Sequence, residues 1–157
     1  MSPVDARALL FGSEAERDWQ MVEANLQKAQ SVDPAKAGPE SAWVALAIDH
    51  ACEAFETMLV RFERSLGLPQ RSGAAWHRAI LDEASRAIPG LRPALVPVDV
   101  LPDWADLLAF RHFLRHAYSA DLEAPRLATL TARLARAVAV TAPAVRSFVE
   151  VLRRDVS

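Results

Sequence analysis

The sequence predicts an all-α protein, an up-and-down bundle of four to five helices. Apolar residues recur three and four positions apart in several long segments, which is the spacing of amphipathic helices. Strand-favouring Ile, Thr and Tyr are scarce among the 157 residues, whereas Ala, Leu and Val are abundant. Proline and glycine divide the chain into helical pieces. The length is typical of one domain, so we expect residues 1–157 to share a single core.

Two long helices are predicted in the first part of the chain. The first runs from about Ser13 to Val32, with Ser13 and Glu16 as a capping box at its start. The second runs from about Glu40 to Leu66 and carries a long apolar stripe. A glycine followed closely by a proline then stops it, because neither residue continues a helix well.

A shorter third helix follows Ser72-Gly73, with an apolar residue at every fourth position from Trp76 to Ile88. Four prolines in the stretch 89–102 predict an extended connector. A fourth helix opens at Leu101-Pro102, where proline suits a helix start and nearby aspartates suit the dipole.

The last predicted helix opens at Pro125 and carries a near-heptad apolar stripe from Leu127 to Leu152. Pro143 lies inside this pattern and lacks the backbone N–H that a helix interior uses. We therefore expect it to kink or split the helix.

Composition restricts the classes of function. Eighteen basic and twenty acidic residues give a net charge of −2, so any nucleic-acid contact must come from a local basic patch. The single cysteine, Cys52, cannot form an intrachain disulfide and is interpreted as a small buried residue, as expected in a reducing compartment. No signal-type or membrane-spanning apolar run is present, so we expect a cytoplasmic, soluble protein with no membrane partner.

The end of the fourth helix concentrates polar chemistry in eight residues. It holds the only tyrosine of the chain, two arginines and two of the four histidines: Arg111, His112, Arg115, His116 and Tyr118. At about 100° per residue, the arginines and the tyrosine fall within about 40° of the line through Trp104. The histidines lie together on another side. The apolar packing face of the helix therefore becomes cationic and phenolic in its last turns.

These residue types suit metal-independent cleavage of RNA through its own 2′-hydroxyl. Histidine, whose ordinary pKa lies near neutrality, can move the protons, and the planar arginine fork can stabilise the phosphorane charge. Arg111 and His116, however, lie about 140° apart around the helix and about 7.5 Å apart along it. One helix presents them awkwardly, whereas two copies related by a two-fold axis could place both around one cleft.

Two simpler interpretations stand beside this one. The helix end could emerge from the core so that its arginines and histidines reach solvent, where cations favour a helix C-terminus. His112 and His116, four positions apart, could instead form a metal pair, but no acidic neighbour in a zinc-protease arrangement and no third ligand is evident. We expect neither a metal nor a cofactor.

The segment from Trp104 to about Leu134 resembles the motif helix and following helix of HepT-type toxins in the HEPN ribonuclease superfamily. That pattern is an arginine, a polar residue, three further residues, a histidine, any residue and a tyrosine, followed by an Asp-Leu turn. Its places are filled here by Arg111, His112, His116, Tyr118 and Asp121-Leu122. The turn at 66–69 is also similar, and the resemblance covers roughly residues 40–155.

The resemblance implies a helical bundle that forms a two-fold homodimer and acts as a metal-independent endoribonuclease on tRNA or mRNA. Arg111 would hold or stabilise the scissile phosphate and His116 would act as acid or base. It further implies an MNT-type nucleotidyltransferase antitoxin, which in some pairs transfers AMP to the motif tyrosine, here Tyr118. A bulky anion at that position would exclude RNA by sterics and charge.

The chain also departs from the family pattern. His112 stands where asparagine is common, which allows a hydrogen-bonding or second proton-transfer role, and Arg115 adds a cation that can contact the RNA backbone. The acidic residues of the second helix are interpreted as a solvated face and receive no role: Asp49, Glu53, Glu56 and Glu63. His77 is interpreted as a surface residue of an amphipathic helix.

Two alternatives to the ribonuclease remain at this point. One is a catalytically silent HEPN module that binds a nucleotide or scaffolds a nucleotidyltransferase partner. The other is an unrelated helical adaptor in which the motif arises by chance.

Overall fold

The computed structural model describes residues 2–33, 39–69, 72–73, 75–90, 92–116 and 122–154. Within these ranges it contains five α-helices and no strand, which confirms the predicted all-α bundle. The helices are α1 (Pro3–Gln30), α2 (Pro39–Ser65), α3 (Trp76–Ala84), α4 (Leu101–His116) and α5 (Ala124–Arg154), with a short 3₁₀ helix η1 (Val98–Val100) before α4.

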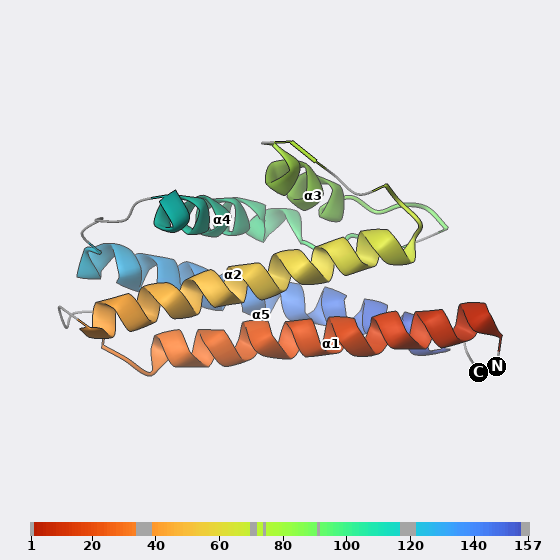
Figure 1. The fold of residues 1–157 in the computed structure, drawn as a ribbon, viewed down its shortest axis with the longest axis horizontal. Helices are drawn as coiled ribbons and strands as arrows, with labels where there is room; N and C mark the ends of the chain where they lie inside the picture. The colour runs from red at the N-terminus through yellow and green to blue at the C-terminus, as the bar shows by residue number, and fades with distance from the viewer. Residues whose placement is uncertain are drawn as a thin grey trace.

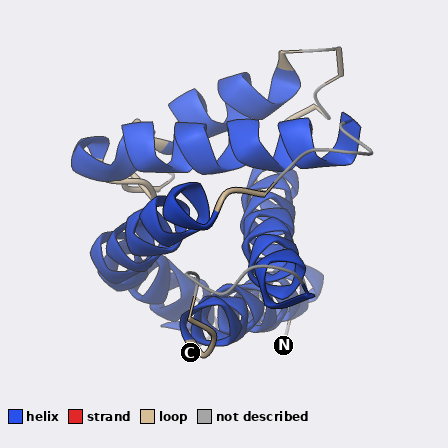
Figure 2. Cartoon of the chain, turned by 90° about the vertical axis from the view of Figure 1, so that its left-hand side faces the viewer, coloured by secondary structure: helices blue, strands red, loops and turns tan. Residues whose placement is uncertain are grey.

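The bundle has two parts. The long helices α1, α2 and α5 lie side by side along the long axis of the molecule (Figure 1). The shorter helices α3 and α4 lie on one side of these three and run across them (Figure 2). Because α4 contacts both α2 and α5, and α3 contacts both α2 and α4, the crossing pair forms the side of the bundle that carries the motif.

The first helix begins at Pro3, well before the predicted start, and the predicted capping box at Ser13 and Glu16 is wrong. The capping box is formed instead by Ser2, whose Oγ accepts from the N–H of Asp5 at 3.1 Å, while Asp5 accepts from the N–H of Ser2 at 2.9 Å. A capping pattern occurs in the sequence both at Ser2 with Asp5 and at Ser13 with Glu16. The earlier one is used because the first turns of α1 pack on α5, where Gly12 lies against its last turns.

The second helix ends as predicted, one residue before Leu66. Gly67 has a φ of +73°, and this left-handed conformation lets the N–H of Leu68 donate to the carbonyl of Glu63 at 3.1 Å. This is the 6→1 bond of a Schellman ending, which explains why a glycine stands there.

The third helix is shorter than predicted and the connector after it is folded back rather than extended. Ile88 lies outside α3 and forms an antiparallel bridge with Arg92, with N···O distances of 2.9 and 3.0 Å. The buried Arg92 guanidinium donates to the carbonyl oxygens of Glu83 and Arg86 at 3.0 and 2.9 Å. These bonds satisfy backbone acceptors at the end of α3, so the chain turns there despite its apolar pattern.

The fourth and fifth helices match their predicted ranges within a few residues. The expected split at Pro143 does not occur: α5 continues through this residue to Arg154. Pro143 and Ala139, whose carbonyl loses its helical donor, are both exposed, so solvent can hydrate that oxygen. In the described ranges, no helix has the length and apolar character that a bilayer crossing requires.

Part of the core lies where α4 meets α2 and α5. Trp104 of α4 is fully buried and stacks on Phe55 of α2, with ring centroids 3.7 Å apart. Its indole N–H donates to the hydroxyl of Thr141 in α5 at 3.1 Å. This buried contact attaches α4 to both long helices two turns before Arg111, and so fixes the position of the polar end of α4.

Candidate functional site

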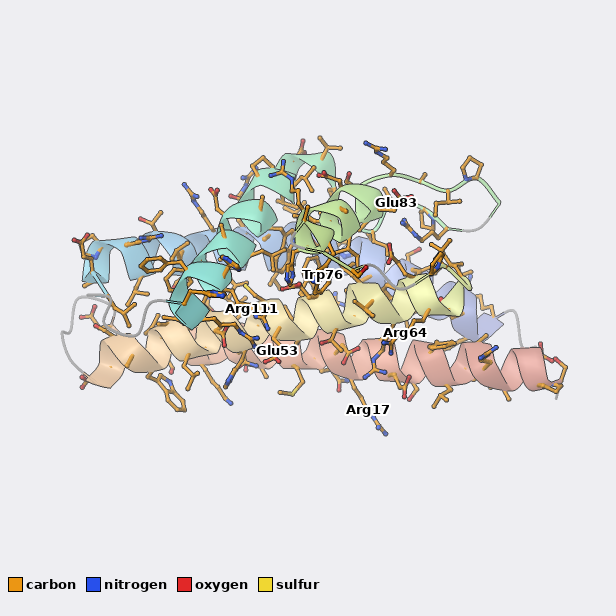
Figure 3. All side chains as sticks on the ribbon, turned by 45° about the horizontal axis from the view of Figure 1, so that its top comes forward. Arg17, Glu53, Arg64, Trp76, Glu83 and Arg111 are labelled. Atoms are coloured by element: carbon orange, nitrogen blue, oxygen red, sulfur yellow. The ribbon has the colours of Figure 1, made fainter. Side chains whose placement is uncertain are left out.

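Arg111 of α4 faces α2 and is largely buried between the two helices (Figure 3). Its Nη1 donates to Oε1 of Glu56 at 3.1 Å, and its Nε lies 3.2 Å from Oδ1 of Asp49. The second contact is an ion pair and not a hydrogen bond. The Nε of Arg111 and the Oδ1 of Asp49 are both buried, and neither has a hydrogen-bond partner among the described residues. The arginine is therefore not a solvated helix terminus.

Arg115 lies one turn further along α4 and is half-exposed. Its Nη2 is 3.6 Å from Oε1 of Glu53, and the same oxygen is 3.8 Å from Nη2 of Arg111. Glu53 is itself half-exposed, and both contacts are longer than a hydrogen bond. The outer part of this ion-pair cluster is thus loose and open to solvent.

The interpretation of the α2 carboxylates as a solvated face is wrong for three of them, because Asp49, Glu56 and Glu63 are buried and only Glu53 is half-exposed. The side chains of Asp49 and Glu56 are only 13% and 7% exposed, because α4 covers the face of α2 on which they lie. Their spacing of seven residues, with Glu53 between them, places all three along that face. This spacing was the available signal, but nothing in the sequence of α2 shows which helix covers it.

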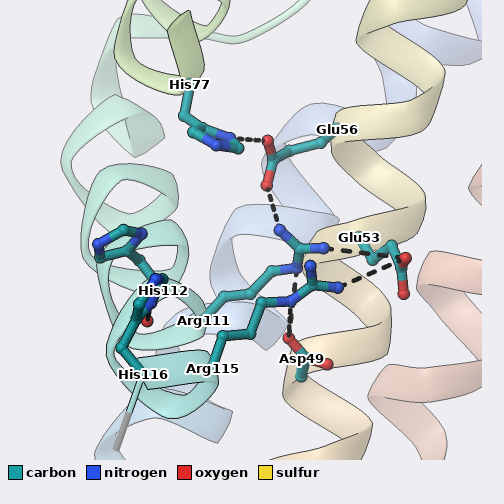
Figure 4. A network of polar contacts seen from close by, with 8 residues as sticks. All are labelled: Asp49, Glu53, Glu56, His77, Arg111, His112, Arg115 and His116. Carbon is teal, nitrogen blue, oxygen red and sulfur yellow. Dashed lines mark hydrogen bonds and ion pairs between the residues drawn. The ribbon is translucent and has the colours of Figure 1, made fainter. Parts of the chain in front are cut away.

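His77 also differs from its interpretation as a simple surface residue. Its Nδ1 is hydrogen-bonded to Oε2 of Glu56, the carboxylate whose other oxygen binds Arg111 (Figure 4). Glu56 therefore connects the α3 histidine to the α4 arginine. Sequence reasoning missed this residue because α3 and α2 come together only in the folded chain.

The two motif histidines lie on a different side of α4 from the arginines, as the helical spacing predicts (Figure 4). The Nδ1 of His116 lies 2.8 Å from the backbone carbonyl of His112, and the two exposed rings are 4.4 Å apart. A carbonyl can only accept, so Nδ1 of His116 carries a proton and donates it. The Nε2 atom of His116 then remains for other chemistry.

An open groove of about 530 Å³ lies between α3 and α4. Both arginines and both histidines of the motif line it, together with His77 and Arg78 of α3. Leucine and alanine side chains form the rest, and among the described lining residues there is no carboxylate. In a chain of net charge −2, this groove is the local basic surface that contact with a polyanion requires.

A second groove of about 510 Å³ adjoins the first along α2. It shares His77, Arg111 and Arg115 with the α3–α4 groove but also contains Glu53 and Glu56. The three shared residues therefore stand at the boundary between a groove without described carboxylates and a groove of mixed charge, which also contains Arg61 and Arg64. An anion is favoured on the α3–α4 side of this boundary.

The other reactive group near the site is excluded by its environment. Burial raises the pKa of the Cys52 thiol, and the neighbouring Glu56 raises it further, so the sulfur stays protonated. A metal site is not supported either, since the described ranges contain no cluster of three or more His, Cys, Asp or Glu residues that could hold one. Tyr118, the predicted modification site, lies outside the described residues.

The family model described as HepT-like protein matches residues 43–152, which is most of the chain and contains α3, α4 and most of α2 and α5. No curated protein and no solved structure matches. The matched range contains every lining residue of the α3–α4 groove.

Proposed function

The chain belongs to the HepT-like family of the HEPN superfamily, and on this premise we propose that it is the toxin of a toxin–antitoxin pair. In this proposal it is a metal-independent endoribonuclease that cleaves tRNA or mRNA. Its partners are a second copy of itself, in a two-fold homodimer, and an MNT-type nucleotidyltransferase antitoxin.

The observation that carries this proposal is the lining of the α3–α4 groove. Three arginines and three histidines meet there, with no carboxylate among the described lining residues: His77, Arg78, Arg111, His112, Arg115 and His116. Cations bind phosphates, histidines move protons near neutral pH, and the apolar remainder offers contact to bases.

The two arginines have different roles in the proposed reaction. Arg115 is half-exposed and meets the substrate phosphate first, while the buried Arg111 stabilises charge on the phosphorane. The phosphate replaces the loosely held carboxylate of Glu53, which lies 3.6 Å from Arg115 and 3.8 Å from Arg111. His116 supplies a proton-transfer group, and the ring of His112 lies beside it with the centroids 4.4 Å apart.

One observation favours the alternative of a catalytically silent module that binds a nucleotide. Each of the terminal nitrogens of Arg111 already faces a carboxylate of α2, and its Nε faces a third. An arginine so engaged could be a structural part of a site that binds a phosphate without cleaving RNA. An intact protein that binds a nucleotide but cleaves no RNA would identify this alternative.

Induced expression of the intact protein, Arg111→Ala and His116→Ala, followed by analysis of cellular RNA, tests the proposal. We expect the intact protein to slow growth and cut RNA, and each variant to lose about 100-fold or more in cleavage rate. Arg146→Ala and His50→Ala are the matched controls, because both residues are exposed and lie outside the groove. An intact protein that leaves RNA uncut, or two variants that cut as well as it does, would contradict the proposal.

Regulation at Tyr118 is tested separately by co-expression with the neighbouring gene, if this encodes a small nucleotidyltransferase. Intact-mass measurement should show AMP-sized increments that disappear in Tyr118→Phe. A modified protein should lose RNA cleavage, because Tyr118 follows the last residue of α4 by two positions in the sequence and the added group is a bulky anion. An unchanged mass would remove this part of the proposal without affecting the ribonuclease.

A further inference from the structure

His77 has no assigned role, yet it contacts a buried carboxylate of the site. It comes from α3, it lines both grooves, and its Nδ1 is hydrogen-bonded to the buried Glu56. We propose that His77 is a catalytic residue of the same reaction and acts as the general base, while His116 acts as the general acid. This inference rests on the proposed ribonuclease function.

The contact with Glu56 determines what His77 can do. A carboxylate accepts the proton on Nδ1, which leaves the lone pair on Nε2 as the basic atom of the ring. The hydrogen-bonded carboxylate also holds this tautomer and fixes the orientation of the ring. Glu56 is in turn held by Nη1 of Arg111 at 3.1 Å and is only 7% exposed. A base oriented by a carboxylate that is itself fixed is the arrangement known from activated catalytic groups.

His116 is oriented in a comparable way on the opposite wall of the groove. Its Nδ1–H donates to the carbonyl of His112 at 2.8 Å, so its Nε2 is also the atom left for proton transfer. The α3–α4 groove thus contains two histidines on different helices with the arginines of α4 also in its lining. Base, acid and cation are then all present in one chain, and the second histidine need not come from a second copy.

The proposed step balances as follows. Nε2 of His77 removes the proton of a ribose 2′-hydroxyl, and the 2′-oxygen forms a bond to the adjacent phosphorus. The bond from phosphorus to the 5′-oxygen breaks, and that oxygen takes the proton from Nε2 of His116. The products are a 2′,3′-cyclic phosphate and a 5′-hydroxyl, and the two histidines return to their starting states by exchange with water.

The pH dependence of this step reflects a set of fixed charges around His77. Those that line the grooves beside it come from α2, α3 and α4: Glu53, Glu56, Arg61, Arg64, Arg78, Arg111 and Arg115. His112 lies on the α4 wall together with His116. A base must be neutral to act, so its protonation should lower the rate at acidic pH. An acid must be protonated, so its ionisation should lower the rate at alkaline pH.

The test is a single-turnover pH profile on an RNA that the intact protein cuts. His77→Asn keeps an amide N–H that can donate to Glu56 but removes the basic nitrogen. We expect it to fold normally, lose about 100-fold or more in rate, and lose the acidic limb of the profile. His116→Asn should lose the alkaline limb instead. His50→Asn, an exposed histidine of α2 outside the grooves, should keep the full profile.

The outcomes separate this inference from the proposed function. If the intact protein cuts RNA and His77→Asn stays within threefold of it, His77 is not the base and the ribonuclease proposal stands. If His77→Asn is slow but keeps both limbs, His77 is only a positioning residue and the inference fails. If the intact protein cuts no RNA at any pH, the proposed function and this assignment fail together.

Discussion

Two groups of ion pairs in this molecule use the same residue types in opposite settings. Between α4 and α2, Arg111 is 11% exposed and contacts Glu56 and Asp49, which are buried as well. Between α5 and α1, Arg153 pairs with Glu16, and both side chains are more than 40% exposed. The α4–α2 ion pairs lie beside the α3–α4 groove, whereas the α5–α1 ion pair lies on the outside of the three long helices.

The difference shows that burial, and not the pairing itself, decides what an ion pair does. A buried charge that loses its partner cannot be hydrated, so each member of the inner group depends on the others. An exposed charge that loses its partner is simply solvated. The inner group can therefore hold α4 against α2 in one arrangement and, through Glu56 and His77, hold α3 as well.

The largest effect is expected from removing the inner arginine. Arg111→Ala leaves Asp49 and Glu56 buried without their cation, so the free energy of unfolding should fall by about 3 kcal/mol or more. Urea denaturation followed by circular dichroism measures it. The triple variant Arg111→Met, Asp49→Asn, Glu56→Gln, which removes the buried charges together, should recover much of this loss. A single variant as stable as the intact protein would show that the cluster is not effectively buried.

A smaller effect is expected at Arg61, whose setting lies between the two extremes. It pairs with Asp18 and Glu14 of α1 at 2.6 and 3.1 Å, and its side chain is 30% exposed. Arg61→Ala should lower the free energy of unfolding by about 1 kcal/mol, measured in the same way. A loss as large as that of Arg111→Ala would contradict the graded dependence on burial.

Removing an outer arginine should have the smallest effect on stability. Arg153→Ala is expected to change the free energy of unfolding by about 0.5 kcal/mol or less, because the freed Glu16 is already largely hydrated. Raising the salt concentration should reduce even this difference. A salt-independent loss above about 1 kcal/mol would mean that the α1–α5 pair matters beyond its charges.

A pH measurement refines the intermediate case. Burial raises the pKa of Asp18 above its ordinary value of 3.8, although Arg61 opposes the shift. Because the native pKa is the higher one, this carboxyl favours folding below its unfolded pKa, and the contribution is lost as pH rises through the native value. As pH rises just above 3.8, the free energy of unfolding of Asp18→Asn should therefore decline less steeply than that of the intact protein. Urea denaturation of both proteins at a series of pH values measures this. The same dependence of unfolding free energy on pH in both would contradict the prediction.

Much of the helical framework follows from local patterns. The end of α2 at Gly67 and the range of α4 were predictable, because capping and 3.6-residue periodicity depend on neighbours in the chain. The start of α1 was missed, since two capping patterns compete and only packing on α5 selects the earlier one. The end of α3 was missed because it depends on Arg92, which lies beyond the helix. The guanidinium of Arg92 donates to backbone carbonyls at the end of α3.

For the candidate site, the sequence by itself determined which residues share a side of α4, because that depends only on helical rotation. It placed Arg111 with Arg115 and His112 with His116, and the structure has the same grouping. Tertiary structure alone decided that Asp49 and Glu56 are buried against Arg111 and that His77 reaches Glu56 from another helix. The periodicity of a helix shows which face is polar. Whether that face meets water or a second helix depends on how the whole chain packs.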